Sequence, residues 1–523
     1  MKKIFLLLTV YAHFSVAQDI FQKTIGGTRD DLANAVQQTS DGGYILTGET
    51  GSFGVGDRDV YFVKVNDKGE VVYSRTYGGS AADYALTLDQ MTDGNYLIGA
   101  HTASFGQGGH DYFLVKTNTL GDTLFTRLYG GSAPDGIYQL KQGVAGIVMA
   151  GHTSSYGAGA HDFYAIKILE SGSVVWTKTF GGSGSDQLRA FTHIEEFVDI
   201  PRLALVGETS GFGAGANDIL FVKTNMDGEL QFAKTYGNTG NDFGYSILET
   251  QDGGFLIAGH TNSSGAGSYD VQLVKTNFSG NVEWTKTYGG SENDYCFSAQ
   301  RTLDGGYILI GSTSSFGGGS SDIYVIKTAA NGDLTWAKTY GGLMADVGRS
   351  IQQTEDGGYV FAGSTSSFGA GQKDIYLIKT DANGTSGCNE FSTNTVVGSG
   401  TIVTSTPNLT IGSGAISSSS PTIVTDPPAQ DSYSCDPLGT GKLENRINVF
   451  PNPFRESITL EFNYESGEFM FRIYTLTGKL VKEIEKIRSG QVVIEKGNLS
   501  DGMYIFHLRR NHQIVGIGKL VAE

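Results

Sequence analysis

The chain has 523 residues, enough for more than one domain, and it contains 75 glycines but only 9 prolines. Its hydrophobic content of 39% and aromatic content of 11% exclude a disordered chain. The formal net charge of -17 argues against a nucleic-acid partner, because binding to phosphates needs a basic surface.

The first residues are typical of an export signal. Lys2 and Lys3 form a basic start, residues 4–12 are apolar, and small residues precede the junction between Ala17 and Gln18. The apolar run is too short to cross a bilayer as a helix, and the sequence contains no other candidate. We therefore predict cleavage after Ala17 and export of a protein without a transmembrane segment.

A phrase of two glycines, followed four residues later by aspartate, recurs in seven copies, with Gly-Asn in place of the double glycine in the fifth. The spacings are 52, 52, 51, 56, 52 and 52 residues. A fixed period of this size indicates a solenoid, propeller or array. The phrases lie at Gly26-Gly27, Gly78-Gly79, Gly130-Gly131, Gly181-Gly182, Gly237-Asn238, Gly289-Gly290 and Gly341-Gly342.

The sixth copy shows the content of one repeat. It contains four strand-like segments. The first begins near residue 294, and the others cover residues 307–310, 322–327 and 334–340. A tight Asp304-Gly305-Gly306 turn follows the first segment. Four antiparallel strands in about 50 residues make one propeller blade.

The ends of the array predict closure. The seventh copy has three strands through residue 380 and no fourth, whereas residues 20–24 form a lone strand at the mature N-terminus. If this strand completes the last blade, no open edge remains. We therefore predict an all-β fold in which residues 18–384 form a closed seven-bladed β-propeller.

Aspartates equivalent to Asp31 and Asp59 recur in every copy. A catalytic carboxylate is needed once or twice, so we expect these residues to accept hydrogen bonds from the glycine-rich loops.

The position after the second strand changes chemistry between copies. Glu and His are metal-binding and acid–base residues, so this position is the candidate ligand site. The competing interpretation is polar residues satisfied by loop backbone. We name five of its residues the Glu/His ring: Glu49, His101, His152, Glu208 and His260; Ser312 and Ser364 fill the position in the last two copies, and His110 and His161 lie on adjoining loops.

No catalytic residue or cofactor follows from these patterns. The chain has no HExxH motif, phosphate loop or dinucleotide fingerprint, and its metal content is unknown, with a divalent cation as the remaining candidate. We expect the ligand to meet the larger, glycine-rich face, because loops on a rigid scaffold carry function.

Residues 385–444 form a Ser/Thr/Gly-rich segment, interpreted as a β-rich spacer and linker. Cys388 and Cys435 bracket most of it, and the exported compartment permits a disulfide between them. Cys296 lies within a repeat and is expected to be a buried free thiol.

Residues 445–523 are predicted to form a small β-sandwich. Three motifs occur here in order: Val449-Phe450-Pro451-Asn452-Pro453-Phe454, Ile473-Tyr474-Thr475-Leu476-Thr477-Gly478-Lys479, and Leu499-Ser500-Asp501-Gly502-Met503-Tyr504. They resemble the C-terminal sorting domain (type A) of type IX secretion substrates. The resemblance implies passage through the periplasm and across the outer membrane of a Bacteroidetes-type bacterium, with the secretion machinery as partner. Such cargo is typically cleaved near the linker, then released or attached to surface lipopolysaccharide.

The repeats are similar to the bacterial β-propeller repeat family, which has no single activity. The matching segments are residues 288–294, 304–307, 311–313 and 322–327. We expect a secreted or cell-surface binding propeller that adheres to, or captures, a polysaccharide or protein. The alternatives are an extracellular polysaccharide-acting hydrolase or lyase that uses the Glu/His ring, and a scaffold without a ligand.

Overall fold

The computed structural model describes residues 19–143, 146–194, 202–400, 402–413, 416–418, 423–425, 430–435, 448–450, 454–462, 469–475, 480–497, 499–510 and 513–522. These residues form strands, turns and loops without a helix, so the all-β prediction is confirmed. The chain divides into two compact units, Met1–Pro437 and Leu438–Glu523. The predicted cleavage site at Ala17 and Gln18 lies outside the described residues.

The first unit contains seven antiparallel sheets, numbered here in the order of the repeat copies. Sheet 1 has β2 (Asp31–Gln38), β3 (Tyr44–Thr50), β4 (Asp59–Val65) and β5 (Val71–Gly78); sheet 2 has β6 (Asp83–Gln90), β7 (Tyr96–Thr102), β8 (Asp111–Thr117) and β9 (Thr123–Gly130). Sheet 3 has β10 (Asp135–Gly143), β11 (Gly146–Thr153), β12 (Asp162–Ile168) and β13 (Val174–Gly181); sheet 4 has β14 (Asp186–Ile194), β15 (Arg202–Thr209), β16 (Asp218–Asn225) and β17 (Leu230–Gly237). Sheet 5 has β18 (Asp242–Glu249), β19 (Phe255–Thr261), β20 (Asp270–Thr276) and β21 (Val282–Gly289). Sheet 6 has β22 (Asp294–Arg301), β23 (Tyr307–Thr313), β24 (Asp322–Thr328) and β25 (Leu334–Tyr340); sheet 7 has β26 (Asp346–Gln353), β27 (Tyr359–Thr365), β28 (Asp374–Thr380) and β1 (Phe21–Gly26).

The tight turn between the first two strands is held by its aspartate. In sheet 1, Gly42 takes a positive φ of 83°, and Asp41 accepts hydrogen bonds from Thr39 and from the Gly43 backbone. The buried ammonium group of Lys64 lies 2.7 Å from the Asp41 carboxylate. Although burial raises the pKa of Asp41, the hydrogen bonds from Lys64 and Thr39 lower it to about 2.

The two recurring aspartates hold the glycine-rich loops. Asp59 Oδ2 accepts hydrogen bonds from the backbone N–H groups of Val55 and Gly56, at 3.0 and 2.9 Å. Asp31 Oδ2 accepts one from the backbone of Gly27, the second residue of the double glycine, at 2.7 Å. Their expected architectural role is confirmed in this copy, and the same contacts recur around the unit.

Each first strand carries a β-bulge at the third residue after its aspartate. The pairing with the second strand shifts there by one residue, so this residue has no partner opposite it. We call these seven positions the bulge ring: Asn34, Leu86, Tyr138, Arg189, Tyr245, Phe297 and Arg349.

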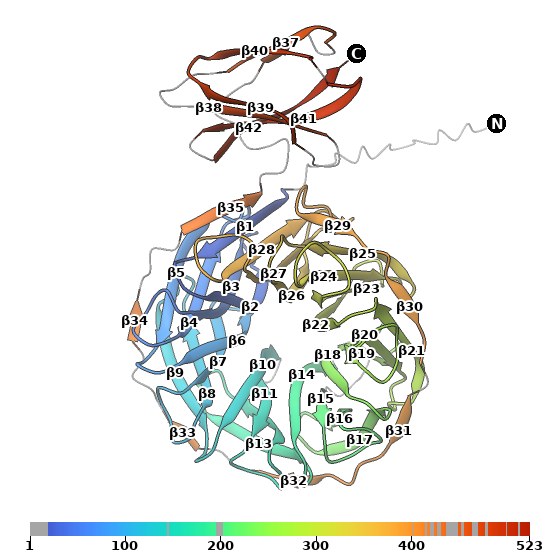
Figure 1. Cartoon of the computed structure of the whole chain (residues 1–523). Helices are drawn as coiled ribbons and strands as arrows, with labels where there is room; N and C mark the ends of the chain where they lie inside the picture. Colours follow the sequence, from blue (N-terminus) through green and yellow to red (C-terminus); the bar gives the residue numbers. More distant parts are fainter. Residues whose placement is uncertain are drawn as a thin grey trace, which may run out of the picture. The chain divides into compact units, whose positions relative to one another are not determined.

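The seven sheets follow one another around a common centre, with the first strand of each copy innermost (Figure 1). Neighbouring inner strands are linked by side chains that accept hydrogen bonds from backbone. Gln37 of sheet 1 accepts one from Gln90 of sheet 2 at 3.0 Å, and Gln352 of sheet 7 accepts the equivalent bond from Gln38 of sheet 1 at 2.6 Å. The last and first sheets therefore meet through the same contact as the first and second.

The N-terminal strand completes the last sheet. β1 pairs antiparallel with β28, with Lys23 opposite Leu377. The predicted pairing of this strand with the seventh copy is confirmed.

A fifth strand on the outer edge of every sheet comes from the segment interpreted as a spacer. We call these strands the belt. They pair with the sheets in descending order from sheet 6 to sheet 1, and the last pairs with β1 of sheet 7. The belt strands are β29 (Glu390–Ser392), β30 (Val396–Gly398), β31 (Val403–Ser405), β32 (Thr410–Gly412), β33 (Ile416–Ser418), β34 (Ile423–Thr425) and β35 (Gln430–Cys435). The belt covers backbone edges that would otherwise remain open.

Apolar side chains fill the contacts between neighbouring sheets. One cluster joins Ile45 and Phe62 of sheet 1 to Ile98 and Phe113 of sheet 2, and all four are buried. Burial of such side chains is the main source of stability in this unit.

The second unit contains two antiparallel sheets around one core that includes Phe471 and Phe506. One sheet has β36 (Asn448–Phe450), β37 (Ser457–Glu461) and β40 (Gln491–Glu495); the other has β39 (Leu480–Ile487), β38 (Phe469–Thr475), β41 (Gly502–Arg510) and β42 (Gln513–Ala522).

Candidate ligand-binding site

The two glutamates of the Glu/His ring are each engaged by an arginine. Both are the penultimate residue of their strand, β3 and β15, and both are buried. Arg58 Nη1 lies 2.7 Å from Glu49 Oε1. The Arg189 guanidinium donates hydrogen bonds to the Glu208 carboxylate: Nε lies 3.0 Å from both oxygens, and Nη2 lies 2.5 Å from Oε1. Burial raises the pKa of Glu208, and the adjacent Arg189 opposes that shift.

His101 has a partner on each ring nitrogen. Its Nε2 lies 2.6 Å from the backbone oxygen of Ile137 in sheet 3, and its Nδ1 lies 3.0 Å from the Tyr84 hydroxyl. Burial lowers the pKa of His101 to about 4, so the ring is neutral at pH 7. Because a carbonyl only accepts, we assign the proton to Nε2.

The other histidines lie against aromatic or polar neighbours. The rings of His152 and His161 are 5.0 Å apart in an edge-on arrangement, and His161 Nδ1 is 2.7 Å from the Ser154 hydroxyl. The ring of His260 stacks on Tyr245 at 5.0 Å. Burial lowers the pKa of His152 to about 3 and that of His260 to about 4.

The structure brings the histidines of sheets 2 and 3 together. The rings of His101 and His152 both lie close to Gly136, where an added Cβ would approach Cε1 of each ring to 2.7 Å. His110 lies 6.4 Å from His101 between ring centroids. Among the described residues, no group of three or more His, Cys, Asp or Glu has a geometry that could hold a metal ion.

A cavity lies elsewhere, among the inner strands. Its volume is about 430 Å³, and each of the seven first strands contributes four consecutive residues to its wall. We call it the central cavity; its lining residues are 34–37, 86–89, 138–141, 189–192, 245–248, 297–300 and 349–352. The lining begins at the bulge ring and continues along each strand toward the tight turns. The glycine-rich loops, which the sequence analysis favoured as the ligand-facing surface, do not line this cavity.

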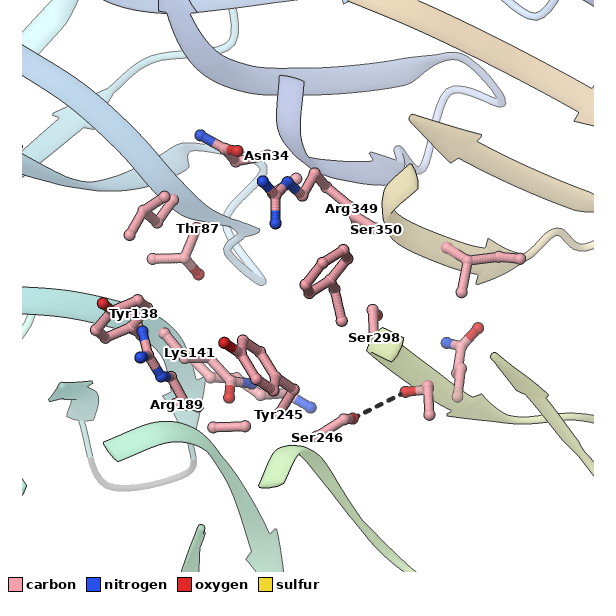
Figure 2. A pocket seen from close by; sticks show the side chains of 18 of the residues that line it. Asn34, Thr87, Tyr138, Lys141, Arg189, Tyr245, Ser246, Ser298, Arg349 and Ser350 are labelled. Atoms are coloured by element: carbon pink, nitrogen blue, oxygen red, sulfur yellow. Dashed lines mark hydrogen bonds between the residues drawn. The ribbon is translucent and has the colours of Figure 1, made fainter. Parts of the chain in front are cut away.

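The bulges aim variable side chains into the central cavity. Figure 2 shows Tyr138, Arg189 and Tyr245 gathered on one side and Arg349 with Asn34 on the opposite side. An unpaired bulge residue is free to turn toward the centre, whereas its neighbours are held in the sheet. Sequence reasoning missed this position. Aligning the copies at their first aspartate would have exposed it, because the third residue onward varies from leucine to arginine.

The cavity wall favours anions although the chain is acidic. Its charged residues are Lys141, Arg189, Arg349 and a single carboxylate, Asp89. The Arg189 guanidinium lies over the Tyr138 ring at 4.4 Å, and that of Arg349 lies over Phe297 at 4.4 Å.

Cys388 is disulfide-bonded. Cys296 is a buried free thiol, which confirms the expectation from the sequence. The side chain of Cys435 lies outside the described residues. Its backbone pairs with Gln22, whose side chain also contacts the backbone oxygen of Cys388. The Cys388–Cys435 pairing therefore stays a prediction.

Solved structures resemble the chain only distantly. One is Sqt1 from Chaetomium thermophilum, with 11% identity, a TM-score of 0.36, and coverage of 66% of this chain and 82% of that chain. Another is a fungal alcohol oxidase of the AA5 family in complex with copper, with 9% identity, a TM-score of 0.36, and coverage of 97% and 100%. Neither likeness is close enough to support an inference. No curated protein sequence matches the chain.

The C-terminal unit matches a known domain family. Within the part of the chain that the structure describes, no helix has the length and apolar character needed to cross a membrane. Residues 448–523 match the family model for the secretion system C-terminal sorting domain. This part of the chain is therefore a type IX secretion sorting domain, and the protein is cargo of that export route.

Proposed function

We propose that this protein is an exported, seven-bladed β-propeller that binds an extracellular polysaccharide or protein, and that its ligand enters the central cavity. The sorting domain supports export to the cell surface or medium. Adhesion at the outer membrane would follow if the sorting domain directs surface attachment.

The hydrogen bonds between inner strands support a closed propeller. Gln352 and Gln38 join sheet 7 to sheet 1 as Gln37 and Gln90 join sheet 1 to sheet 2. β1 completes sheet 7, and one belt strand pairs with the outer edge of each sheet. Such closure gives a rigid frame on which seven inner positions can vary without loss of the fold.

The bulge ring is the observation that carries the binding proposal. It presents three aromatic and two guanidinium side chains to one cavity, and ligand pockets are typically lined by aromatic groups with a few polar ones. Figure 2 shows Tyr138, Arg189, Tyr245 and Arg349 converging from four different sheets. The Glu/His ring supports the hydrolase or lyase alternative less well, because arginines already engage Glu49 and Glu208.

The test is binding of the purified protein to an array of glycans and cell-envelope polysaccharides, with and without divalent cations. The cavity variant is Tyr138→Ala with Tyr245→Ala, and the matched control is Phe391→Ala, an aromatic residue that is 55% exposed on the belt. Removing two aromatic anchors should weaken binding at least tenfold, since such anchors often contribute about 2 kcal/mol or more. Thermal denaturation confirms that each variant is folded.

Equal binding by the cavity variant and the wild type would place the ligand outside the central cavity. A blank array would argue against a glycan, and a pull-down from cell envelopes would then test the protein-ligand form of the proposal.

A further inference from the structure

Two arginines occupy equivalent positions in the bulge ring, but only one has an ionic partner. Arg189 in sheet 4 is held by both oxygens of the buried Glu208. Arg349 in sheet 7 is exposed to the cavity and forms no ion pair with any described carboxylate. The two copies therefore place the same cation in different electrostatic settings.

The difference traces to one position of the second strand. Glu208 lies opposite Gln187, two residues before Arg189. In sheet 7 the equivalent residue is Ser364, opposite Val347 and likewise two residues before the arginine. A serine carries no charge, so Arg349 lacks the neutralising group that Arg189 has.

The carboxylate of Glu49 in the adjacent sheet 1, which acts on Arg349, is already engaged. Glu49 acts on Arg349 at a distance, but its own carboxylate lies 2.7 Å from Arg58. A guanidinium with no carboxylate partner keeps several donors available in a fork that matches a carboxylate or phosphate.

The surroundings of Arg349 indicate the size and shape of the ligand. Its guanidinium lies over Phe297, and Tyr245 and Asn34 line the same cavity. The volume of about 430 Å³ suits a ring-sized group or two rather than a long segment of polymer. A net charge of -17 also opposes an extended polyanion spread over the protein.

We propose that Arg349 is the anion subsite of the central cavity and binds the carboxylate of an acidic sugar residue, a uronate, at the end of a saccharide. The sugar ring lies against Phe297 and Tyr245 while the carboxylate meets the guanidinium fork. This inference rests on the proposed binding function and narrows its ligand to one class.

The first experiment combines a change in the protein with a change in the ligand. Calorimetry measures binding of tetragalacturonate, of its methyl ester and of the neutral cellotetraose to wild type, Arg349→Gln and the control Arg29→Gln. Arg29 is exposed and does not line the central cavity. Each of the two variants removes one positive charge, so the control separates the loss of charge from the loss of the cavity contact. We expect Arg349→Gln to weaken tetragalacturonate binding about 10- to 100-fold, and Arg29→Gln to change it less than about twofold.

Esterification should weaken binding to the wild type by a similar factor and have little effect on Arg349→Gln, because the two changes remove the same contact. An equal effect of esterification on both proteins would overturn the proposal. Binding of the neutral tetrasaccharide alone would also overturn it, yet would leave the proposed binding function standing. If no saccharide binds, both the uronate subsite and the glycan form of the function fail.

The second experiment supplies the missing partner from within the protein. Ser364→Glu places a carboxylate in sheet 7 at the position equivalent to that of Glu208 in sheet 4. The new carboxylate should form an ion pair with Arg349 and so compete with the ligand. The expected result is loss of tetragalacturonate binding in a folded protein, with Ser364→Gln retaining it. Undiminished binding by a folded Ser364→Glu variant would contradict the assignment of Arg349.

Discussion

Replacing Glu208 by glutamine should destabilise the first unit strongly. The change leaves the charge of Arg189, whose side chain is only 15% exposed, without its carboxylate. Breaking a buried ion pair from one side costs about 3–5 kcal/mol. With an unfolding entropy of about 2.1 cal/mol/K per residue over roughly 400 residues, the melting temperature should fall by about 4–6 °C.

Glu49→Gln is the matched control, because Glu49 occupies the same position in sheet 1. Its partner Arg58 is 49% exposed, so solvent can take over much of the interaction. Loss of such a pair costs about 0–1 kcal/mol, or roughly 1 °C here. Differential scanning calorimetry at pH 7 measures both shifts. Equal decreases in melting temperature for the two variants would refute the reasoning. The double variant Arg189→Gln with Glu208→Gln should recover part of the stability that Glu208→Gln loses, and no recovery would also refute it.

Three further predictions concern buried histidine, glycine packing and the disulfide. Since burial lowers the pKa of His152 to about 3, the unfolded chain takes up a proton below pH 6.5 that the folded state excludes, and stability falls as the pH drops toward 3. Between pH 6.5 and 4.5, the free energy of unfolding of His152→Gln should fall by up to about 2 kcal/mol less than that of the wild type. Parallel plots of melting temperature against pH for the two proteins would contradict this. Gly136→Ala places a Cβ 2.7 Å from two imidazole rings and should lower the free energy of unfolding by about 1–3 kcal/mol. The control Gly318→Ala, whose added Cβ has its nearest contact at 3.5 Å, should leave the melting temperature unchanged. Equal decreases in melting temperature for the two variants would be inconsistent with this packing. Thiol titration of the denatured, unreduced protein should find Cys296 alone, and Cys388→Ser should cost about 2–4 kcal/mol; more than one thiol in the wild type would argue against an intrachain disulfide.

The repeated sheets could be predicted because their signal is local. Turn glycines, alternating strands and a regular period are each visible within 50 residues, and the lone N-terminal strand has the pattern of a missing fourth strand. The belt could not be predicted in this way. Its strands β29 to β32 are three residues long and mostly exposed, and they join the sheets through backbone pairing, which leaves little side-chain pattern.

The sequence analysis and the proposed binding site use the same criterion at different positions of the repeat. The sequence analysis sought residues that differ between copies, and it chose the end of the second strand because Glu and His stand there. Those side chains have internal partners, such as Ile137 for His101. The bulge that turns Arg349 inward is a property of backbone pairing, and a single-strand pattern does not reveal it.

Comparison of pairs of positions would have been more informative than comparison of one position at a time. Arg189 and Arg349 look equivalent along the first strand, and Glu208 and Ser364 look like ordinary variation along the second. Considered together, they distinguish an arginine paired with a carboxylate from one without such a partner, because the residue on the second strand decides whether the guanidinium charge is matched. An unmatched charge is costly where it is buried, and it is tolerated where the side chain faces water or a ligand. Arg349 is exposed in the wall of the central cavity, so its unmatched charge can be solvated or can bind an anionic ligand.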